Sequence, residues 1–502
     1  MPIHSEINLK LLALDVGAES GRAIIGAFNG HTLRLKEVHR FSNGPVRVNN
    51  HFYTDILNIW EQVQLGLKKG LVASGTHLNG VGVDTWGVDY ALLDGNDQLL
   101  GNPYHYRDHR TNGIENQLHT LVTPKNVYFQ TGNQFMPFNT LYQLYAMRQQ
   151  EPQMLEQAGS LLMLPDLIHF WLCGVKTSEF CIATTTQCFD QKNNVWAKDI
   201  LEKLQIPLDL FQEISQPGTV LGVVQPWIIP PASQNRIPVI LPASHDTGSA
   251  VTAVPAEGKD FLYISSGTWS LVGTELEEPV ITLESMEKNL TNEGNPGSRT
   301  RFLKIVPGMW LLQQCKQAWF ESGKDYTYDQ LTSMAAIETE CGSIVDITSP
   351  EFFDPGGMPA RIQTFCQKSG QPIPHTEGEI VRCILESLAY LYRSLLDDFQ
   401  VVLGRKLDPI HIIGGGSRNF LLNQLTANVT RRTVVAGPVE ATAAGNILVQ
   451  VMGLGELGSM EEIRTVVRQS FNLQTFTPAV SGVWDGGYDC YKMMMENKFL
   501  NL

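Results

Sequence analysis

The chain of 502 residues is short of paired cysteines, of positive charge and of long apolar runs, and each shortage excludes a class of protein. Its eight cysteines lie far apart without a C-x-x-C pair, which argues against a disulfide framework or a zinc site and favours reduced thiols in the cytoplasm. Lysine and arginine number 37 against 51 acidic residues, so we do not expect nucleic acid as a partner. No run of 18 apolar residues occurs, and the start MPIHSEINLK lacks the apolar stretch of a secretion signal. We therefore expect a cytoplasmic globular protein with no membrane association.

Common phosphate- and metal-binding motifs are also missing or out of place. The chain has no G-x-x-x-x-G-K-[ST], which excludes the common P-loop. GLGELG at 453–458 fits G-x-G-x-x-G, but it follows the helix-like AAGNILVQVM instead of a strand, so we do not expect a nucleotide there. HYRDH at 105–109 holds two histidines four residues apart. Pro103 before it and Asn112-Gly113 after it favour a loop of solvated polar side chains over a metal site.

The alternation of strand and helix patterns predicts an α/β protein of two similar halves. A chain of this length usually fills two domains of roughly 250 residues each. LKLLALDV, GAESGR and AIIGAF predict two strands joined by a tight turn, and TLRLKEVHRF a third. An amphipathic helix (Ile59, Val63, Leu67 and Leu71 on one face) and the strand-like GVGVDTWGVDYALL follow.

The second half repeats this order of elements. FLYI, a Ser/Gly turn and SLVGTEL predict two strands, TRFLKIV a third and GMWLLQQCKQAWF a helix. A long helix ending at Gly404 comes later, followed by the strand and Gly-rich turn of PIHIIGGGSRN. We place the domain boundary near 254–260, giving an N-terminal domain 1–253 and a C-terminal domain 254–502, with a cleft where the two halves meet.

Two segments of the first half contain candidate ligand-binding residues. LPASHDTGSAV surrounds Asp246 with small side chains that leave room for a ligand beside it. The structural alternative is that Asp246 caps a helix beginning at Thr247. GVDTWGVD combines Asp84 and Asp89 with Trp86, whose face could stack on a sugar; the alternative is a buried strand with Trp86 in the core.

Three Gly-rich turns are candidate phosphate or nucleotide sites. In DVGAESGR the glycines at 17 and 21 permit close backbone approach and positive φ, and Asp15 could hold Mg²⁺ through water. SSGTW, at 265–269, offers the same chemistry in the second half. IIGGGSRN follows a strand and opens a helix, so its small residues can admit a flat ring. An ordinary hairpin or strand-to-helix turn is the alternative for each.

Together these segments resemble the FGGY family of carbohydrate kinases. DVGAESGR, GVDTWGVD, YRDHRT, FMPFNTLYQL, LPASHDTGSAV, SSGTWSLVG, TNEG, GMWLLQ, HIIGGGSRN and AGPVEATAAGN occur in the family's order over residues 15 to 446. The resemblance implies two ribonuclease-H-like domains, of the actin/hexokinase-like ATPase kind, flanking a central cleft that holds sugar and nucleotide. It implies MgATP-dependent phosphorylation of the 1-hydroxyl of L-rhamnulose. The sequence does not determine whether the protein is a monomer or a homodimer.

The resemblance also implies roles for individual residues. Asp246 matches the catalytic base. The implied substrate contacts are Gly87, His245, Asp246 and Thr247, with Asp84 and Trp86 as weaker candidates. The implied nucleotide contacts are Ala18, Glu19, Ser20, Gly21 and Arg22 in the first turn, Thr268 in the second, Gln313, and Gly415 on the adenine side. Asp15 is assigned to the Mg²⁺ shell.

Two positions depart from the pattern of relatives that act on L-rhamnulose. Glu19 stands where those relatives have a serine in GASSGR, and it brings a negative charge into a turn that should hold negative phosphates. Three arrangements stay open for its carboxylate: it points outward, pairs with Arg22 or faces the metal. Ile305 stands where those relatives have an asparagine. The apolar side chain would lose a hydrogen bond to a sugar or nucleotide hydroxyl, which is worth about 0.5–1.5 kcal/mol. Two alternatives therefore stay open: a kinase for another ketose, such as L-fuculose or xylulose, and a non-catalytic sugar- or nucleotide-binding relative.

Overall fold

The computed structural model describes residues 8–229, 236–338, 342–479 and 482–497. The chain divides into two compact units that interleave along the sequence: unit 1 comprises residues 1–257, 275–303 and 440–471, and unit 2 comprises residues 258–274, 304–439 and 472–502. The division into sequence domains 1–253 and 254–502 stays a prediction, and the compact units add that the chain returns to unit 1 twice after first leaving it.

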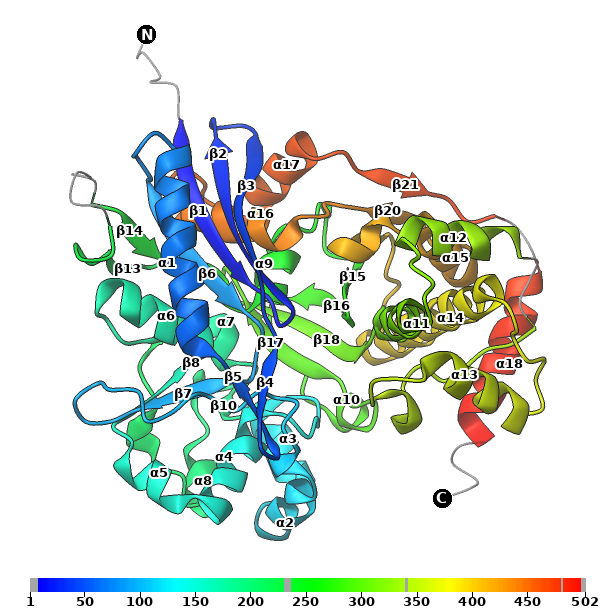
Figure 1. Ribbon diagram of the computed structural model, residues 1–502, viewed down its shortest axis with the longest axis horizontal. Coiled ribbons are helices and arrows are strands. Elements are labelled where there is room, and N and C mark those ends of the chain that lie inside the picture. Colours follow the sequence, from blue (N-terminus) through cyan, green and yellow to red (C-terminus); the bar gives the residue numbers. More distant parts are fainter. Residues whose placement is uncertain (1–7, 230–235, 339–341, 480–481, 498–502) are drawn as a thin grey trace. The chain divides into compact units, whose positions relative to one another are not determined.

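A mixed β-sheet forms the centre of unit 1 (Figure 1). β1 pairs antiparallel with β2 and parallel with β6, and β2 pairs antiparallel with β3. The apolar residues of LKLLALDV are buried throughout its second half, as expected for a strand covered on both faces. The sheet order is β13-β14-β6-β1-β2-β3, with bounds β13 Val220–Val223, β14 Pro238–Ile240, β6 Gly80–Thr85, β1 Leu9–Val16, β2 Ser20–Phe28 and β3 Leu33–Ser42.

Helices cover both faces of this sheet. α1 (Ile56–Ala73) packs on β1, β2 and β3, and α6 (Leu164–Cys173) packs on β6. The predicted apolar face of α1 is confirmed, since its four residues are at most 2% exposed. α9 (Asp246–Thr252) and α16 (Ala441–Gly453) pack against each other, and both contact β6. α16 reaches unit 1 although it lies almost 200 residues beyond α9 in the sequence.

A second core of unit 1 lies among short helices inserted after β7. It is built from Val127, Leu141, Leu144, Leu161 and Leu201 with their neighbours. The remaining elements of unit 1 are β4 Pro45–Val48, β5 His51–Thr54, β7 Tyr90–Leu93, α2 Ile114–Leu121, α3 Pro124–Thr131, α4 Thr140–Gln150, α5 Pro152–Gln157, β8 Ser160–Met163, β9 Ser178–Glu179, α7 Phe180–Ala183, β10 Phe189–Asp190, β11 Val195–Trp196, α8 Lys198–Lys203, β12 Ile214–Ser215, α10 Leu283–Glu287, β17 Thr291–Asn295 and α17 Met460–Ser470.

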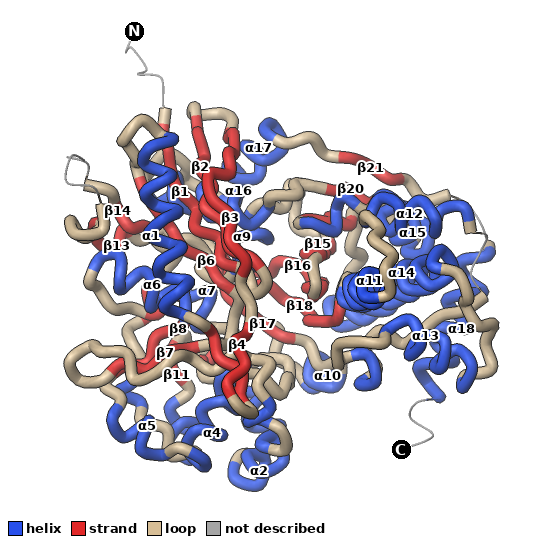
Figure 2. Tube along the Cα trace, viewed as in Figure 1, coloured by secondary structure: helices blue, strands red, loops and turns tan. Residues whose placement is uncertain are grey.

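Unit 2 repeats the strand plan of unit 1, and Figure 2 shows its strands in red and its helices in blue. β15 pairs antiparallel with β16 and parallel with β19, as β1 does with β2 and β6. The predicted repeat of strand, turn and strand is thereby confirmed. The elements are β15 Leu262–Ser266, β16 Trp269–Leu276, β18 Arg299–Pro307, α11 Trp310–Glu321, α12 Tyr328–Ile337, α13 Met358–Lys368, α14 Glu377–Leu403, β19 Ile410–Ile413, α15 Phe420–Thr430, β20 Val434–Ala436, β21 Gln474–Phe476 and α18 Val483–Asn497. The end of β16, from residue 275, and the start of β18, up to residue 303, belong to unit 1.

Three local expectations are corrected. The hairpin of β4 and β5 stands between the third strand and the first helix, where none was predicted. Neither Gly17 nor Gly21 has positive φ. HYRDH is not a solvated loop throughout, because His105 and Asp108 are 3% and 5% exposed. Asp108 accepts the N–H groups of Phe52 and Arg110, so its carboxylate serves the loop itself.

GLGELG begins at the last residue of α16, so the expectation that no strand precedes it is confirmed. Over the part of the chain that is described, no helix is both long and apolar enough to span a bilayer. Within the same residues, Cys173, Cys181, Cys188 and Cys315 take part in no disulfide.

Candidate active site

Asp246 opens α9 at the edge of the unit 1 sheet. His245 is the N-cap residue and forms a parallel bridge to Thr85, the last residue of β6. The alternative that Asp246 caps a helix beginning at Thr247 is therefore wrong, because the helix begins at Asp246 itself. Oδ1 of Asp246 accepts the backbone N–H and the hydroxyl of Thr247. The side chain of Asp246 is 29% exposed, whereas residues 241–245 are buried.

A buried carboxylate fixes the segment that leads to Asp246. Glu179 accepts the N–H groups of Cys181 and Ile182 at the start of α7, and it also accepts the N–H of Ser244 at 3.0 Å. Burial raises the pKa of Glu179 to about 7, and these backbone hydrogen bonds oppose the rise. Glu179 thus ties a separate helix to the backbone beside His245.

Three carboxylates gather at the ends of β1, β6 and α9. Asp15 and Asp84 are register partners in neighbouring parallel strands. Burial raises the pKa of Asp15 and, more strongly, that of Asp84, and the charge of Asp246 raises both further. Of these three groups, only Asp246 is substantially open to solvent.

The two buried carboxylates already have partners. Arg22, the register partner of Asp15 on β2, contacts both Asp15 and Glu440. Asp84 accepts a hydrogen bond of 2.6 Å from the amide of Asn446 on α16. Oδ1 of Asp84 is buried and has no hydrogen-bond partner among the described residues. Asp246 is therefore the carboxylate of the three that is most accessible to a ligand.

The first Gly-rich turn is shaped by packing as well as by its backbone. A Cβ at Gly21 would stand 2.0 Å from the ring of Phe41, so that glycine is required for packing. The N–H of Gly17 donates to the carbonyl of Ser20 and closes the turn. Glu19 is exposed at the tip. The cation of Arg22 is held by Asp15 and Glu440 instead of standing alone as a positive charge.

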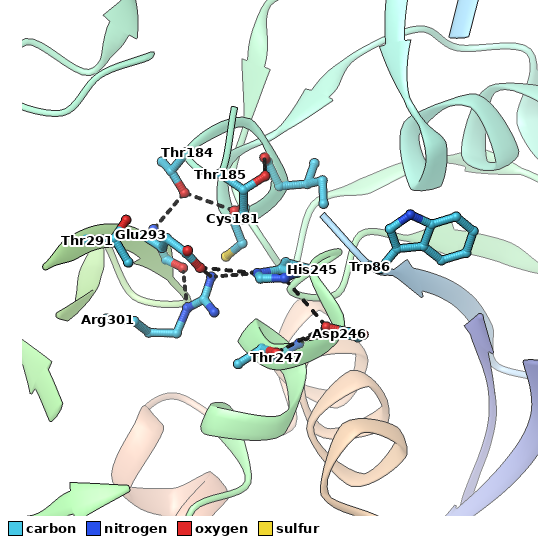
Figure 3. A network of polar contacts seen from close by, with 12 residues as sticks. Trp86, Cys181, Thr184, Thr185, His245, Asp246, Thr247, Thr291, Glu293 and Arg301 are labelled. Carbon is cyan, nitrogen blue, oxygen red and sulfur yellow. Dashed lines mark hydrogen bonds and ion pairs between the residues drawn. The ribbon is translucent and has the colours of Figure 1, made fainter. Parts of the chain in front are cut away.

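His245 connects Asp246 to a buried ion pair (Figure 3). Its Nε2 lies 3.5 Å from Oδ1 of Asp246. Its Nδ1 lies 3.2 Å from Nη2 of Arg301 and 3.3 Å from Oε2 of Glu293. Burial by itself would raise the pKa of Glu293, but the charge of Arg301 is the largest opposing cause, and that pKa lies below its ordinary value.

Gly87 lies beside His245, and Trp86 points into the core. A Cβ at Gly87 would stand 3.4 Å from Nε2 of His245 and 3.2 Å from Oγ1 of Thr185. Any other residue would therefore fill the space next to the imidazole. Trp86 is 7% exposed and donates its Nε1–H to Asp89 at 2.9 Å, which corresponds to the core interpretation of this tryptophan. Burial raises the pKa of Asp89 to about 7.

In unit 2 the second turn brings two predicted residues together. Nε2 of Gln313, on α11, donates to Oγ1 of Thr268 at 3.1 Å. The N–H of Gly308 donates to the carbonyl of Thr268, and the N–H of Met309 to that of Gly267, so the start of α11 is fixed to the turn. Oε1 of Gln313 is buried without a hydrogen-bond partner in the described ranges, so it is available to a ligand.

The three glycines of IIGGGSRN serve different purposes. Gly414 has φ of 78°, a conformation that favours glycine. A Cβ at Gly416 would stand 2.0 Å from Oγ of Ser266, so this glycine permits close packing on β15. Gly415 is exposed, and a Cβ there would meet no atom within 4 Å. A 3₁₀ turn (Gly415–Arg418) separates β19 from α15, so the predicted helix begins later than expected.

The comparisons with known proteins agree with this geometry. The model of the FGGY carbohydrate kinase N-terminal domain matches residues 10–253, and that of the C-terminal domain matches residues 262–454. The chain belongs to the FGGY family of carbohydrate kinases. It is 39% identical to a rhamnulokinase of Oceanobacillus iheyensis, over 93% of this chain and 97% of the relative. It is 40% identical to a rhamnulokinase of Bacteroides thetaiotaomicron, over 96% and 98%.

Solved structures show the same fold at low sequence identity. A ligand-bound xylulose kinase from Lactobacillus acidophilus superposes with a TM-score of 0.79 at 17% identity, covering 97% of this chain and 98% of that one. Plasmodium falciparum glycerol kinase with ADP gives a TM-score of 0.77 at 14% identity, covering 99% of each chain. The predicted fold, two α/β domains of the sugar kinase and actin-like ATPase kind, is confirmed.

Sequence reasoning missed several residues that hold the site together, namely Glu179, Glu293, Arg301, Glu440 and Asn446. Two of the quoted motifs contained part of the signal: TNEG includes Glu293, and AGPVEATAAGN includes Glu440 and Asn446. Neither motif had been given a role. Glu293 and Arg301 are partners on one hairpin, but their contact with His245, and those of Glu440 with Arg22 and of Asn446 with Asp84, join distant parts of the chain, so no local spacing pointed to them.

Proposed function

We propose that this protein transfers the γ-phosphoryl group of ATP to the 1-hydroxyl of L-rhamnulose, with Asp246 as the general base. Family membership supports a carbohydrate kinase, and the relatives named rhamnulokinase, at about 40% identity over nearly the whole chain, support this ketose. The observation that carries the base assignment is the partial exposure of Asp246 beside two buried, partnered carboxylates.

Asp246 accepts the proton of the sugar hydroxyl as its oxygen attacks the γ-phosphorus. The bond from phosphorus to the β,γ-bridging oxygen breaks and ADP leaves, so charge and atoms balance with one proton on Asp246. Small neighbours let the hydroxyl approach to roughly 2.6–3.2 Å, the distance that proton transfer requires. Positioning and charge neutralisation supply the remaining catalysis in phosphoryl transfer.

Sugar contacts in this proposal come from unit 1. Gly87 leaves the space beside His245, and Thr247 holds the base through two hydrogen bonds. Asp84 and Trp86 stay weaker candidates for direct contact, because one is bound to Asn446 and the other is nearly fully buried.

The proposed nucleotide contacts form two groups of residues, and each group is described by itself. Thr268 and Gln313 form one hydrogen-bonded pair for phosphate oxygens, and Gly415 offers open backbone for the adenine. The turn of Ala18, Glu19, Ser20 and Gly21 offers backbone N–H groups, and Arg22 stands at its end.

Mg²⁺ fits the carboxylates of Asp15 and Asp84. Within the described residues no group of three His, Cys, Asp or Glu side chains could hold a metal ion directly. Mg²⁺ commonly keeps several waters and binds through one or two carboxylates plus substrate phosphates. The unpartnered Oδ1 of Asp84 and the neighbouring Asp15 suit such water-mediated binding, and the ion, when bound, supplies charge neutralisation for the phosphates.

A panel of ketoses tests the substrate. Purified protein is incubated with MgATP and L-rhamnulose, L-fuculose or D-xylulose, ADP release is followed by a coupled assay, and the phosphorylated position is determined by ³¹P–¹H NMR. We expect the highest kcat/KM for L-rhamnulose and phosphorylation at O1. A higher kcat/KM for another sugar would identify that ketose as the substrate and would link the change of specificity to Ile305, which stands where an asparagine is expected. Calorimetric binding of sugar without any binding of ATP would indicate the non-catalytic alternative.

The proposed role in L-rhamnose catabolism implies that the protein acts in the cytoplasm.

A further inference from the structure

The hairpin of β17 and β18 contains a buried ion pair that the proposed function does not use. Glu293 of the TNEG motif and Arg301 face each other as register partners on the two antiparallel strands. Arg301 is fully buried and Glu293 is 2% exposed. A buried pair of this kind contributes little to stability when compared with apolar residues of similar size, so its purpose has to be sought in what it contacts.

The guanidinium of Arg301 is held through Nε and Nη2, whereas its Nη1 has no hydrogen-bond partner among the described residues. Its Nε donates to the carbonyl of Gly294 at 2.9 Å. Its Nη2 lies 3.1 Å from Oε2 of Glu293 and 3.2 Å from Nδ1 of His245. Nη2 can only donate, and Nδ1 of His245 lies within hydrogen-bonding distance of it, whereas its contact with Oε2 of Glu293 is an ion pair without a hydrogen bond. The hydrogen bond to the histidine is therefore fixed by groups on the hairpin and not by the histidine itself.

Contact with arginine decides which ring nitrogen of His245 carries the hydrogen. An arginine N–H only donates, and arginine keeps its charge in proteins, so Nδ1 of His245 must accept. A neutral imidazole that accepts at Nδ1 carries its hydrogen at Nε2. The competing arrangement has Nδ1–H donating to Glu293, 3.3 Å away. That arrangement would turn Nδ1–H of His245 and an Nη2–H of Arg301 toward each other. In addition, Oε2 of Glu293 lies closer to Arg301, at 3.1 Å, than to the histidine.

Nε2 then presents a hydrogen to the space where the substrate binds. The distance of 3.5 Å from Nε2 to Oδ1 of Asp246 is too long for a strong hydrogen bond, so this hydrogen is not committed to the carboxylate. The absent side chain of Gly87 leaves open the position 3.4 Å from Nε2. Figure 3 shows the imidazole between the ion pair and Asp246.

We propose that Arg301, held by Glu293, is a positioning residue that fixes His245 in the neutral Nε2–H tautomer and so makes it a hydrogen-bond donor to an oxygen of the ketose next to Asp246. The identity of the acceptor as a ketose rests on the proposed function, whereas the tautomer does not. Arg301 does not touch the substrate in this scheme and acts through His245.

The tautomer can be measured on the unchanged protein. Protein labelled with ¹⁵N only in histidine is studied by magic-angle-spinning NMR at neutral pH, and the His245→Gln variant identifies the His245 signals. We expect one unprotonated Nδ1 and one protonated Nε2. A protonated Nδ1, whether in the other neutral tautomer or in the imidazolium, would overturn the proposal. This measurement requires neither activity nor a substitution at Arg301.

Variants of the ion pair give a directional test. In Arg301→Met, Glu293 becomes the nearest partner of Nδ1, and we expect the hydrogen to move to Nδ1. In Glu293→Gln, Arg301 remains and we expect Nε2–H to persist. Arg299→Met is the matched control, because Arg299 lies on β18 like Arg301 but pairs with Glu275 of β16 and does not contact His245. A change of tautomer in Glu293→Gln, or none in a folded Arg301→Met, would contradict the proposal.

Kinetics provide a second readout. Loss of one donor to the sugar should raise the KM for the ketose about tenfold in Arg301→Met, with the KM for ATP unchanged and Arg299→Met near wild type. Equal changes in both KM values would indicate general damage and refute the positioning role. If the sugar panel identifies a different ketose, the proposed substrate fails, and the NMR measurement still decides whether His245 carries its hydrogen at Nε2. If an active kinase shows a protonated Nδ1, this inference fails and the proposed function stands.

Discussion

Replacement of Asp246 by Asn removes one proton acceptor and one negative charge while it preserves the shape of the side chain. The amide oxygen of Asn can still accept the N–H and the hydroxyl of Thr247. The side chain is 29% exposed, so the new NH₂ group can reach water. The change also removes a charge that raises the pKa of Asp15 and Asp84. We therefore expect the free energy of unfolding to stay within about 1 kcal/mol of wild type.

Turnover should fall much more than stability. A positioned general base is worth about 10²–10⁴ in rate, which corresponds to roughly 3–5 kcal/mol in the activation barrier. Sugar affinity should change by less than about threefold, since an acceptor remains at the same position. The expected pattern is a large loss in kcat with the dissociation constant of the sugar almost unchanged.

Three measurements on one preparation separate these effects. Coupled ADP release gives kcat, calorimetry gives sugar affinity, and urea unfolding gives stability. Asp97→Asn is the matched control, because Asp97 is exposed, pairs with Lys176 on the surface and should leave all three values unchanged. A kcat for Asp246→Asn within tenfold of wild type would remove Asp246 from the base role. A loss of sugar binding equal to the loss of kcat would make it a binding residue instead.

Three further predictions concern the scaffold. Asp89 has a pKa raised to about 7 by burial, so the folded state holds its proton more tightly than the unfolded state. Stability should fall as pH rises from about 4 to 7, and Asp89→Asn should remove about 1 kcal/mol per pH unit of that slope in urea unfolding. Gly445→Ala places a Cβ 1.8 Å from the backbone carbonyl oxygen of Ser249 in α9, so it should lower the Tm measured by calorimetry by several degrees. Gly486→Ala is the control and should not lower Tm, because a Cβ there would meet no atom within 4 Å. Arg464→Met breaks a buried contact of 2.7 Å with Glu275 and should destabilise the protein by about 3 kcal/mol in urea unfolding; wild-type stability of this variant would show that the pair contributes nothing.

The local elements were predictable where one short stretch of sequence contains the whole pattern. The apolar face of α1 follows from residues three and four apart, and the strands on both sides of GAESGR follow from β-branched and apolar runs. The repeat in unit 2 was visible because the same order of elements recurs. The β4–β5 hairpin was missed, because all four residues of β4 are exposed and its sequence has no alternation of buried and exposed side chains to recognise.

The candidate site was predictable as a set of motifs but not as a set of contacts. Asp246, Gly87 and His245 were named from sequence, and the structure brings them together through the bridge between β6 and the start of α9. Thr268 and Gln313 were also named, and they form a hydrogen bond. The substrate and nucleotide roles of these residues stay proposals.

The sequence by itself determined the local elements, the repeat of strand plans and the positions of the functional motifs, because these depend on the spacing of residues close together in the chain. Only the tertiary structure decided that Asn446 binds Asp84, that Glu440 binds Arg22, and that Arg301 meets His245. Such contacts join residues from tens to hundreds of positions apart, and they exist only when the strands and helices that carry them are packed. The charge state and hydrogen-bonding role of each site residue depend on that packing, since burial and neighbouring charges set them.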